Sequence, residues 1–177
     1  NYGEGATTMA LNFASALAHD PSKNILLIDG NLRSPHLHNY FRCERANGIV
    51  DLIRGDIDIE QAIRKTPTQR LYFIPAGREH SSPIILFESA EFAAVMDKLH
   101  AMFEFIIFDS SPLIRFSETT MLASRLDGLI LILEAESTRR EVAQAARSNL
   151  ERTGARVYGA ILNKKQFYIP QKLYRLL

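Results

Sequence analysis

The sequence predicts an α/β fold with a doubly wound, mostly parallel sheet and helices on both faces. Two observations lead to this prediction. Apolar runs of strand length recur along the chain, and segments with helical periodicity separate them. The apolar runs are continuous, which is typical of parallel strands that are buried on both faces. Strands that alternate with helices imply right-handed crossovers, and hence a parallel sheet with a helical layer on each side.

The first half of the chain begins with a glycine-rich stretch and a predicted helix. Apolar residues from Ala10 to Leu17 fall at i, i+3, i+4 and i+7, and an Asp-Pro-Ser turn then ends the helix. Residues 24–30 form the first predicted strand. Helical periodicity in two pieces follows at about 49–65, and residues 71–77 form the next strand.

The second half repeats the alternation of helices and strands. Helices are predicted at 89–102, 118–125 and 138–152, and strands at 103–111, 126–135 and 155–163. The last helix has the best defined limits. Thr138 and Glu141 have the spacing of a capping box at its start, and Gly154 follows its end.

The composition is that of a soluble globular domain. Of 177 residues, 46% are hydrophobic and 23% are charged, so we expect a packed core. The net charge of +1 gives no reason to expect nucleic acid as a partner. Cys43 is the single cysteine and cannot form an internal disulfide, so we assign it no role. The apolar runs are shorter than the roughly 20 residues of a membrane-spanning helix.

The segment GEGATT has the pattern of a phosphate-binding loop that opens a helix. Its residues are Gly3, Glu4, Gly5, Ala6, Thr7 and Thr8. Such a loop directs backbone N–H groups and the positive end of a helix dipole at one point, where an anion is expected. In the full motif a lysine reaches the β- and γ-phosphates and the next hydroxyl coordinates Mg²⁺. Here Ala6 stands at the lysine position, and the pattern alone also fits an ordinary threonine-rich helix start.

A phosphate-binding loop normally follows a buried strand, and only two residues precede Gly3. We therefore expect residues 1–177 to form a single P-loop domain that lacks its first strand. Residues 164–177 are expected to form a C-terminal tail.

Two aspartates end aliphatic strands, at the sheet edge where doubly wound folds bind ligands. Asp109 has the form of a Walker B aspartate, which binds magnesium through water. Asp29 can hold a metal-bound water or orient a hydroxyl, and Arg33 can reach a phosphate, although an ion pair between these two side chains is the simpler interpretation. We assign catalytic roles to Asp29, Arg33 and Asp109, and Mg²⁺ binding to Thr7, Asp29 and Asp109.

Eight stretches of the sequence follow one family pattern in order. They are GEGATT, LLIDGNLRSPHLHNYF, GIVDLIRGD, LYFIPAG, SPIILFES, IIFDSSPL, LDGLILILEAEST and GAILN. In these stretches the chain resembles the bacterial tyrosine kinases of capsule and exopolysaccharide synthesis, the BY-kinases, over about nine tenths of its length.

The resemblance implies ATP or ADP and Mg²⁺ as cofactors, with Asn163 near the adenine. It also implies a cytoplasmic domain at the inner face of the cell membrane. The implied partner there is a membrane polysaccharide co-polymerase that regulates chain length, and the implied assembly is a homo-oligomeric ring. Family members phosphorylate a tyrosine-rich tail, of which only Tyr168 and Tyr174 are present here.

Three residues depart from the family pattern, and all three concern one pocket. Ala6 replaces the lysine, Asn31 replaces the second aspartate of Asp-x-Asp-x-Arg, and Glu118 stands where an aspartate is usual. Loss of one such preorganised charge typically costs roughly 10²- to 10³-fold in rate. Ground-state binding is less affected, because the backbone amides and Thr7 remain.

We therefore expect a kinase-like domain that binds nucleotide weakly or not at all, transfers phosphate poorly and acts as a scaffolding or regulatory partner in polysaccharide export. One alternative is an active tyrosine autokinase in which Arg33, or a residue ahead of Asn1, replaces the lysine. Another is a partition-type or division-site ATPase. A metal site at His36 and His38 is not expected, because no acidic or cysteine partner lies at ligand spacing.

Overall fold

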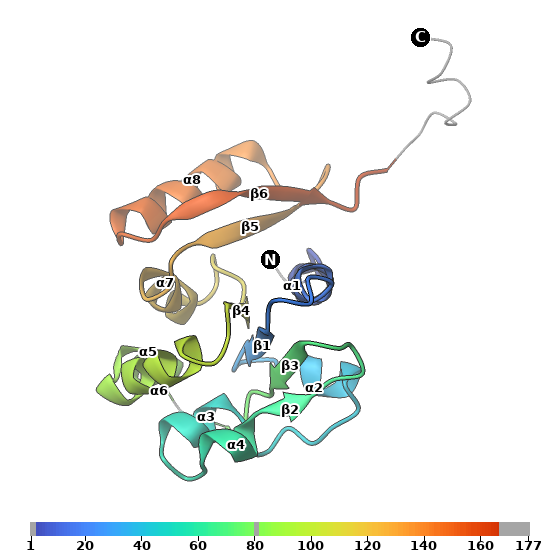
Figure 1. Ribbon diagram of the computed structural model, residues 1–177. Coiled ribbons are helices and arrows are strands. Elements are labelled where there is room, and N and C mark those ends of the chain that lie inside the picture. The colour runs from blue at the N-terminus through green and yellow to red at the C-terminus, as the bar shows by residue number, and fades with distance from the viewer. Residues whose placement is uncertain (1–2, 80–81, 167–177) are drawn as a thin grey trace, which may run out of the picture.

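The computed structural model describes residues 3–79 and 82–166, and it has the predicted α/β architecture (Figure 1). The strands form a four-stranded sheet in the order β2–β3–β1–β4 and a two-stranded sheet, β5–β6. Their bounds are β1 (Ile25–Gly30), β2 (Arg64–Lys65), β3 (Leu71–Ile74), β4 (Phe105–Ser110), β5 (Leu129–Glu134) and β6 (Val157–Asn163). All neighbouring strands are parallel except β2, which is antiparallel to β3.

Helices lie on both faces of the larger sheet and on the smaller sheet. Their bounds are α1 (Ala6–Leu17), α2 (Leu37–Tyr40), α3 (Ile49–Ile53), α4 (Ile59–Ala62), α5 (Pro83–Glu88), α6 (Ala90–His100), α7 (Ser117–Ser124) and α8 (Arg140–Arg152). None of the helices within the described ranges is long and apolar enough to cross a membrane.

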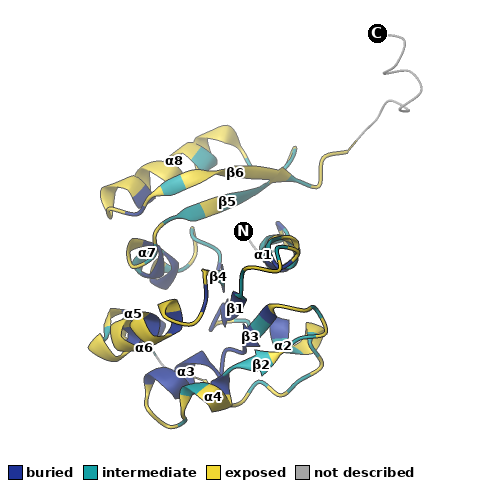
Figure 2. Cartoon of the chain, viewed as in Figure 1, coloured by how far each residue is buried: buried dark blue, intermediate teal, exposed yellow. Residues whose placement is uncertain are grey.

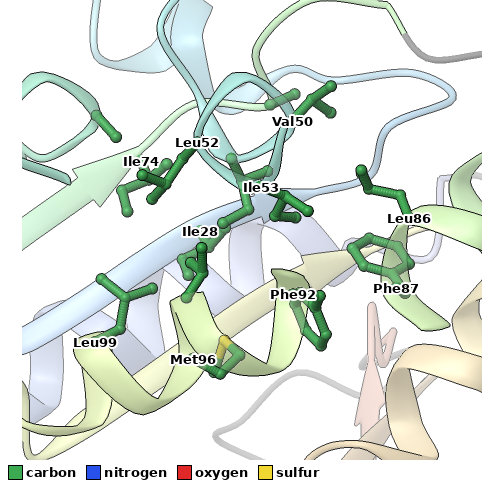
Figure 3. Close-up of a cluster of buried hydrophobic side chains, with 14 of the residues drawn as sticks. Ile28, Val50, Leu52, Ile53, Ile74, Leu86, Phe87, Phe92, Met96 and Leu99 are labelled. Atoms are coloured by element: carbon green, nitrogen blue, oxygen red, sulfur yellow. The ribbon is translucent and has the colours of Figure 1, made fainter. Parts of the chain in front are cut away.

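Strand β1 lies at the centre of the core. Every residue of β1 is buried, because it has a parallel neighbour on each side and helices over both faces. Leu26 and Ile28 belong to a cluster that includes side chains of α3 and α6, whereas Leu27 belongs to a cluster that includes side chains of α1. Figure 3 shows Ile28 with Phe92 and Met96 of α6 in the first cluster. This packing fixes the position of the carboxyl end of β1.

Strands β5 and β6 and helix α8 form a smaller unit around Leu150, which is fully buried with Ala155 nearby. Leu129, Leu131 and Val157 pack against this cluster. Most residues of the two strands are only half-buried or exposed, as the teal and yellow ribbon in Figure 2 shows. Helix α7 contacts both α5 and α8 and thereby joins this unit to the rest of the fold.

One predicted helix is shorter than its periodicity suggested. The second helical piece within 49–65 ends at Ala62, and Arg64–Lys65 form β2 against β3 instead. The prediction was wrong here because pairing with a strand edge overrides local helical periodicity. Tyr168 and Tyr174 of the predicted tail lie outside the described residues.

Candidate functional site

The loop at residues 3–8 has a backbone that requires glycine. Gly3 and Gly5 have φ angles of 84° and 89°, in the left-handed region. A side chain at Gly5 would also collide with the amide group of Asn163. Helix α1 begins at Ala6, directly after the loop, so the N–H groups of its first turn lack helical partners. Helix starts of this kind bind anions in proteins.

Thr7 connects the loop to the larger sheet. Its Oγ1 donates a hydrogen bond of 2.7 Å to Asp109 Oδ2 at the end of β4. Asp109 is the register partner of Asp29 in the neighbouring strand β1. Side chains at the same level of adjacent strands point to the same face of a sheet. The structure therefore brings Thr7, Asp29 and Asp109 together at the carboxyl ends of β1 and β4.

Asp29 is fully buried, with 0% of its surface exposed. Its Oδ2 accepts a hydrogen bond of 3.1 Å from the Leu37 N–H, whereas its Oδ1 has no hydrogen-bond partner in the described part of the chain. Burial, and then the charge of Asp109, raise the pKa of Asp29 to about 7. Burial raises the pKa of Asp109 to about 6, against the lowering effect of the Thr7 hydrogen bond. When both carboxylates are ionised they repel each other, and a bound cation would offset this.

The oxygen atoms of this group fit Mg²⁺, which prefers carboxylate, hydroxyl and phosphate oxygens. The buried Asp29 Oδ1 without a partner is the observation that favours a cation here. Among residues 3–79 and 82–166 there is no group of three or more His, Cys, Asp or Glu side chains that could hold a metal ion. Mg²⁺ is commonly bound by one or two carboxylates together with water and substrate phosphates.

Glu4 connects the other side of the loop to the smaller sheet. Its Oε1 accepts a hydrogen bond of 2.8 Å from Thr138 Oγ1, and its carbonyl accepts one of 2.8 Å from Asn163 Nδ2. The capping box predicted at Thr138 does not form, because α8 begins at Arg140 and the threonine hydroxyl bonds to Glu4 instead. The loop thus reaches from Asp109 on β4 to Asn163 on β6.

A cleft of about 460 Å³ opens beside the loop. Its lining includes the loop, residues 110–114 at the end of β4 and just beyond it, residues 129–133 of β5 and part of α8. All six predicted loop residues line it, and they are Gly3, Glu4, Gly5, Ala6, Thr7 and Thr8. Asp109 is linked to the cleft through Thr7, and Asn163 is linked to it through Glu4.

Asn31 and Arg33, which follow β1, hold neighbouring segments together. Asn31 Oδ1 accepts a hydrogen bond of 2.7 Å from Ser111 Oγ, across from the end of β4. Arg33 Nε donates to Oε1 of the buried Glu118 at 2.6 Å, and the guanidinium lies 5.6 Å from the centre of the Phe116 ring. The departure from the family pattern at Glu118 is therefore in direct contact with Arg33.

The lining of the cleft contains one cation that the sequence did not single out for the site. Lys164 lines the cleft, and its Nζ lies 3.1 Å from Glu134 Oε1. No sequence signal distinguishes this lysine from Lys165 beside it, because its place depends on where β6 ends. Sequence reasoning also missed Thr138 as a loop contact, since its partner Glu4 is 134 residues away.

A family model described as an AAA domain matches residues 2–149. The chain belongs to the AAA domain family. Its relatives include the tyrosine-protein kinase CpsD of Streptococcus agalactiae, which is 29% identical over 163 residues, a match that spans 92% of this chain and 71% of CpsD.

Two solved structures place this AAA domain among known folds. The VpsO kinase domain is 31% identical, with a TM-score of 0.88, and the match covers 93% of this chain and 81% of that domain. The septum site-determining protein MinD of Pyrococcus horikoshii, complexed with Mg-ADP, is 23% identical with a TM-score of 0.74. The match covers 99% of this chain and 72% of the MinD chain. At this identity the likeness supports the fold alone. The predicted P-loop fold and the relation to bacterial tyrosine kinases are confirmed.

Proposed function

We propose that this chain is a kinase-like domain of capsule or exopolysaccharide synthesis that binds Mg²⁺ and nucleotide in the cleft and transfers phosphate poorly. Its relation to CpsD and to the VpsO kinase domain supports the kinase-like part of the proposal. The observation that supports impaired phosphate transfer is Ala6. It places a methyl side chain at the first position of α1, where the BY-kinases that the sequence resembles have a lysine.

Nucleotide binding is supported by the groups that remain in the loop. The free N–H groups at the start of α1 are suited to phosphate oxygens. Bound Mg²⁺ would neutralise part of the phosphate charge, and Thr7 and Asp109 are the residues proposed to hold it. Asp29, buried beside Asp109, is proposed to hold a water molecule of that ion or to orient an acceptor hydroxyl.

Poor phosphate transfer is supported by the engagement of the nearby cations. A positive charge at the loop stabilises the charge that gathers on the phosphate in the transition state, and its removal costs roughly 10²- to 10³-fold in rate. Arg33 pairs with Glu118, and Lys164 pairs with Glu134. Each carboxylate offsets the field that its partner would supply at the loop. These pairs favour an impaired domain over the active autokinase, in which Arg33 or a residue ahead of Asn1 would replace the lysine. Lys164, which lines the cleft, is a further candidate for this role.

We further propose that the domain acts at the inner face of the cell membrane with a polysaccharide co-polymerase as its partner, and that it assembles as a homo-oligomer. The resemblance to the BY-kinases supports this placement. A partition-type ATPase is the second candidate, and the fold likeness to MinD is the observation in its favour.

Titration of the protein with ATP and with ADP, in the presence and absence of Mg²⁺, tests the proposal. We expect micromolar binding that requires Mg²⁺ and is weakened by Thr7→Ala, together with phosphotyrosine only after Ala6→Lys. The matched control is Ala16→Lys, which adds the same charge at an exposed position of the same helix. Absence of binding in both the original and the Ala6→Lys protein would leave only the scaffolding role. Strong phosphotyrosine formation by the original chain would favour the autokinase.

A further inference from the structure

Helix α2 bridges the carboxyl ends of β1 and β3. The Leu37 N–H at its start donates a hydrogen bond of 3.1 Å to Asp29 Oδ2 near the end of β1. Phe41, which directly follows the helix, has its ring centre 4.5 Å from that of Phe73 in β3. Asp29 is the register partner of Asp109 in β4. The start of α2 therefore lies beside the two carboxylates of the candidate site.

Arg45 is held near α2 by the backbone that follows β3. Its Nε donates a hydrogen bond of 2.8 Å to the Gly77 carbonyl, and the Gly77 N–H donates one of 3.0 Å to the Arg45 carbonyl. Between the helix and Arg45, the Cys43 N–H donates a hydrogen bond of 3.0 Å to the His38 carbonyl and turns the chain back on α2. The Arg45 guanidinium is thus positioned by a neutral carbonyl group, which does not neutralise its charge.

Three basic side chains near α2 form no ion pair in the described part of the chain, and they are His36, His38 and Arg45. Arg33, which follows β1, pairs with Glu118 by contrast. His36 is exposed, whereas His38 and Arg45 are half-buried. Partial protection from water strengthens the interaction of a charged group with a ligand of opposite charge.

The three side chains form a row that begins near the carboxylates. Burial raises the pKa of Asp109 to about 6, and the Thr7 hydrogen bond and then the charge of His36 act against this rise, so His36 lies within electrostatic range of Asp109. Burial, and then the charges of Arg45 and His36, lower the pKa of His38. His38 is therefore near both other members of the row, and a neighbouring negative charge would relieve their repulsion.

The two imidazole rings have unused capacity for hydrogen bonds. His36 Nδ1 lies 2.6 Å from the Ser34 carbonyl oxygen, which only accepts hydrogen bonds, so Nδ1 carries a proton and Nε2 is left for a ligand. His38 Nδ1 is buried and has no hydrogen-bond partner within residues 3–79 and 82–166. A protonated ring donates from both nitrogens, and a neighbouring anion favours protonation. Both rings are thus suited to an anionic ligand.

We propose that His36, His38 and Arg45 bind acidic side chains that flank the acceptor tyrosine of a protein segment. This inference rests on the proposed function, in which Asp29 orients an acceptor hydroxyl beside Asp109. An extended segment advances about 3.3 Å per residue, so residues one to three positions from the tyrosine lie within about 10 Å of it along the chain. Carboxylates at these positions are within reach of the row when the tyrosine hydroxyl is at Asp29.

Two labelled peptides test the proposal in the absence of nucleotide. One carries two glutamates on each side of a single tyrosine, and the matched peptide carries glutamines at the same four positions. Fluorescence anisotropy at low salt should show at least about tenfold tighter binding of the acidic peptide. Arg45→Gln and His36→Gln should each reduce this preference by at least about threefold. The control is Arg152→Gln, which removes the same charge at an exposed position at the end of α8 and should leave the preference unchanged.

Arg45→Lys separates loss of charge from loss of structure, because it keeps the charge and should keep most of the preference. Equal affinity of the original protein for the two peptides would overturn the proposal, as would a preference that Arg45→Gln and His36→Gln both leave unchanged. Vesicles of phosphatidylglycerol are the third probe. Vesicle binding that requires Arg45, without discrimination between the peptides, would assign the row to a lipid surface and overturn the proposal. Since no nucleotide is present, failure of ATP binding would refute the proposed function separately.

Discussion

Substitution Asp29→Asn should remove a pH dependence from the stability of the protein. Burial, and then the charge of Asp109, raise the pKa of Asp29 from 3.8 to about 7. Because the pKa is raised in the folded state, the proton binds the folded state more tightly than the unfolded state. The resulting stability is fully present below about pH 4 and is lost as the pH rises through about 7.

The size of this effect follows from the pKa. One pKa unit corresponds to about 1.4 kcal/mol, so the rise of about three units corresponds to about 4 kcal/mol. About 2 kcal/mol of this is lost between about pH 5 and pH 7. The asparagine side chain in the variant carries no charge at any pH. The free energy of unfolding of the variant should therefore equal that of the original protein near pH 4 and exceed it above pH 7. Mg²⁺ should reduce the difference above pH 7, because it binds only the carboxylate of the original protein.

Urea denaturation at a series of pH values from about 5 to 8.5 measures the difference between the two proteins. Asp20→Asn is the control, because Asp20 is exposed and hydrogen bonds to Ser22 lower its pKa to about 2, so that its charge is constant over this range. The reasoning would be refuted if the free energies of unfolding of Asp29→Asn and the original protein differed by the same amount, within about 0.5 kcal/mol, at every pH in the range.

Three further substitutions test the contacts around the loop. Arg33→Ala should destabilise the fold by about 1 to 2 kcal/mol, because it leaves Glu118 buried without this cation. In urea denaturation, the double change Arg33→Ala with Glu118→Gln should cost less stability than the sum of the two single changes. Additive costs would contradict the pairing. Asn163→Ala should weaken the binding of ATP and of inorganic tripolyphosphate equally, because the side-chain amide donates a hydrogen bond to the Glu4 carbonyl in the loop. Calorimetry measures both affinities, and a loss of affinity for ATP alone would indicate a contact with the base instead. Gly5→Ala should lower the melting temperature through its φ of 89°, and an unchanged melting temperature would show that the loop conformation is not required.

Much of the fold could be predicted because each strand is a continuous apolar run. The run ILLIDG became β1 with every residue buried, and the helical periodicity around Leu150 became α8. Proximity of Asp29 and Asp109 also followed from the sequence, since carboxyl ends of parallel strands share one edge of a sheet.

The remaining features depend on long-range contacts that no local pattern encodes. Thr138 has the spacing of a helix cap, but its hydroxyl bonds to Glu4 at the far end of the chain. Arg64–Lys65 join a strand edge although helical periodicity precedes them.

The rate at which the protein labels itself with the γ-phosphoryl group of radioactive ATP tests the central claim most directly. It is measured for the original chain and for Ala6→Lys. We predict that the original chain is at least about 10²-fold slower than Ala6→Lys at equal occupancy by Mg²⁺ and ATP. Equal rates in the two proteins would contradict the claim that the missing ammonium group limits phosphate transfer.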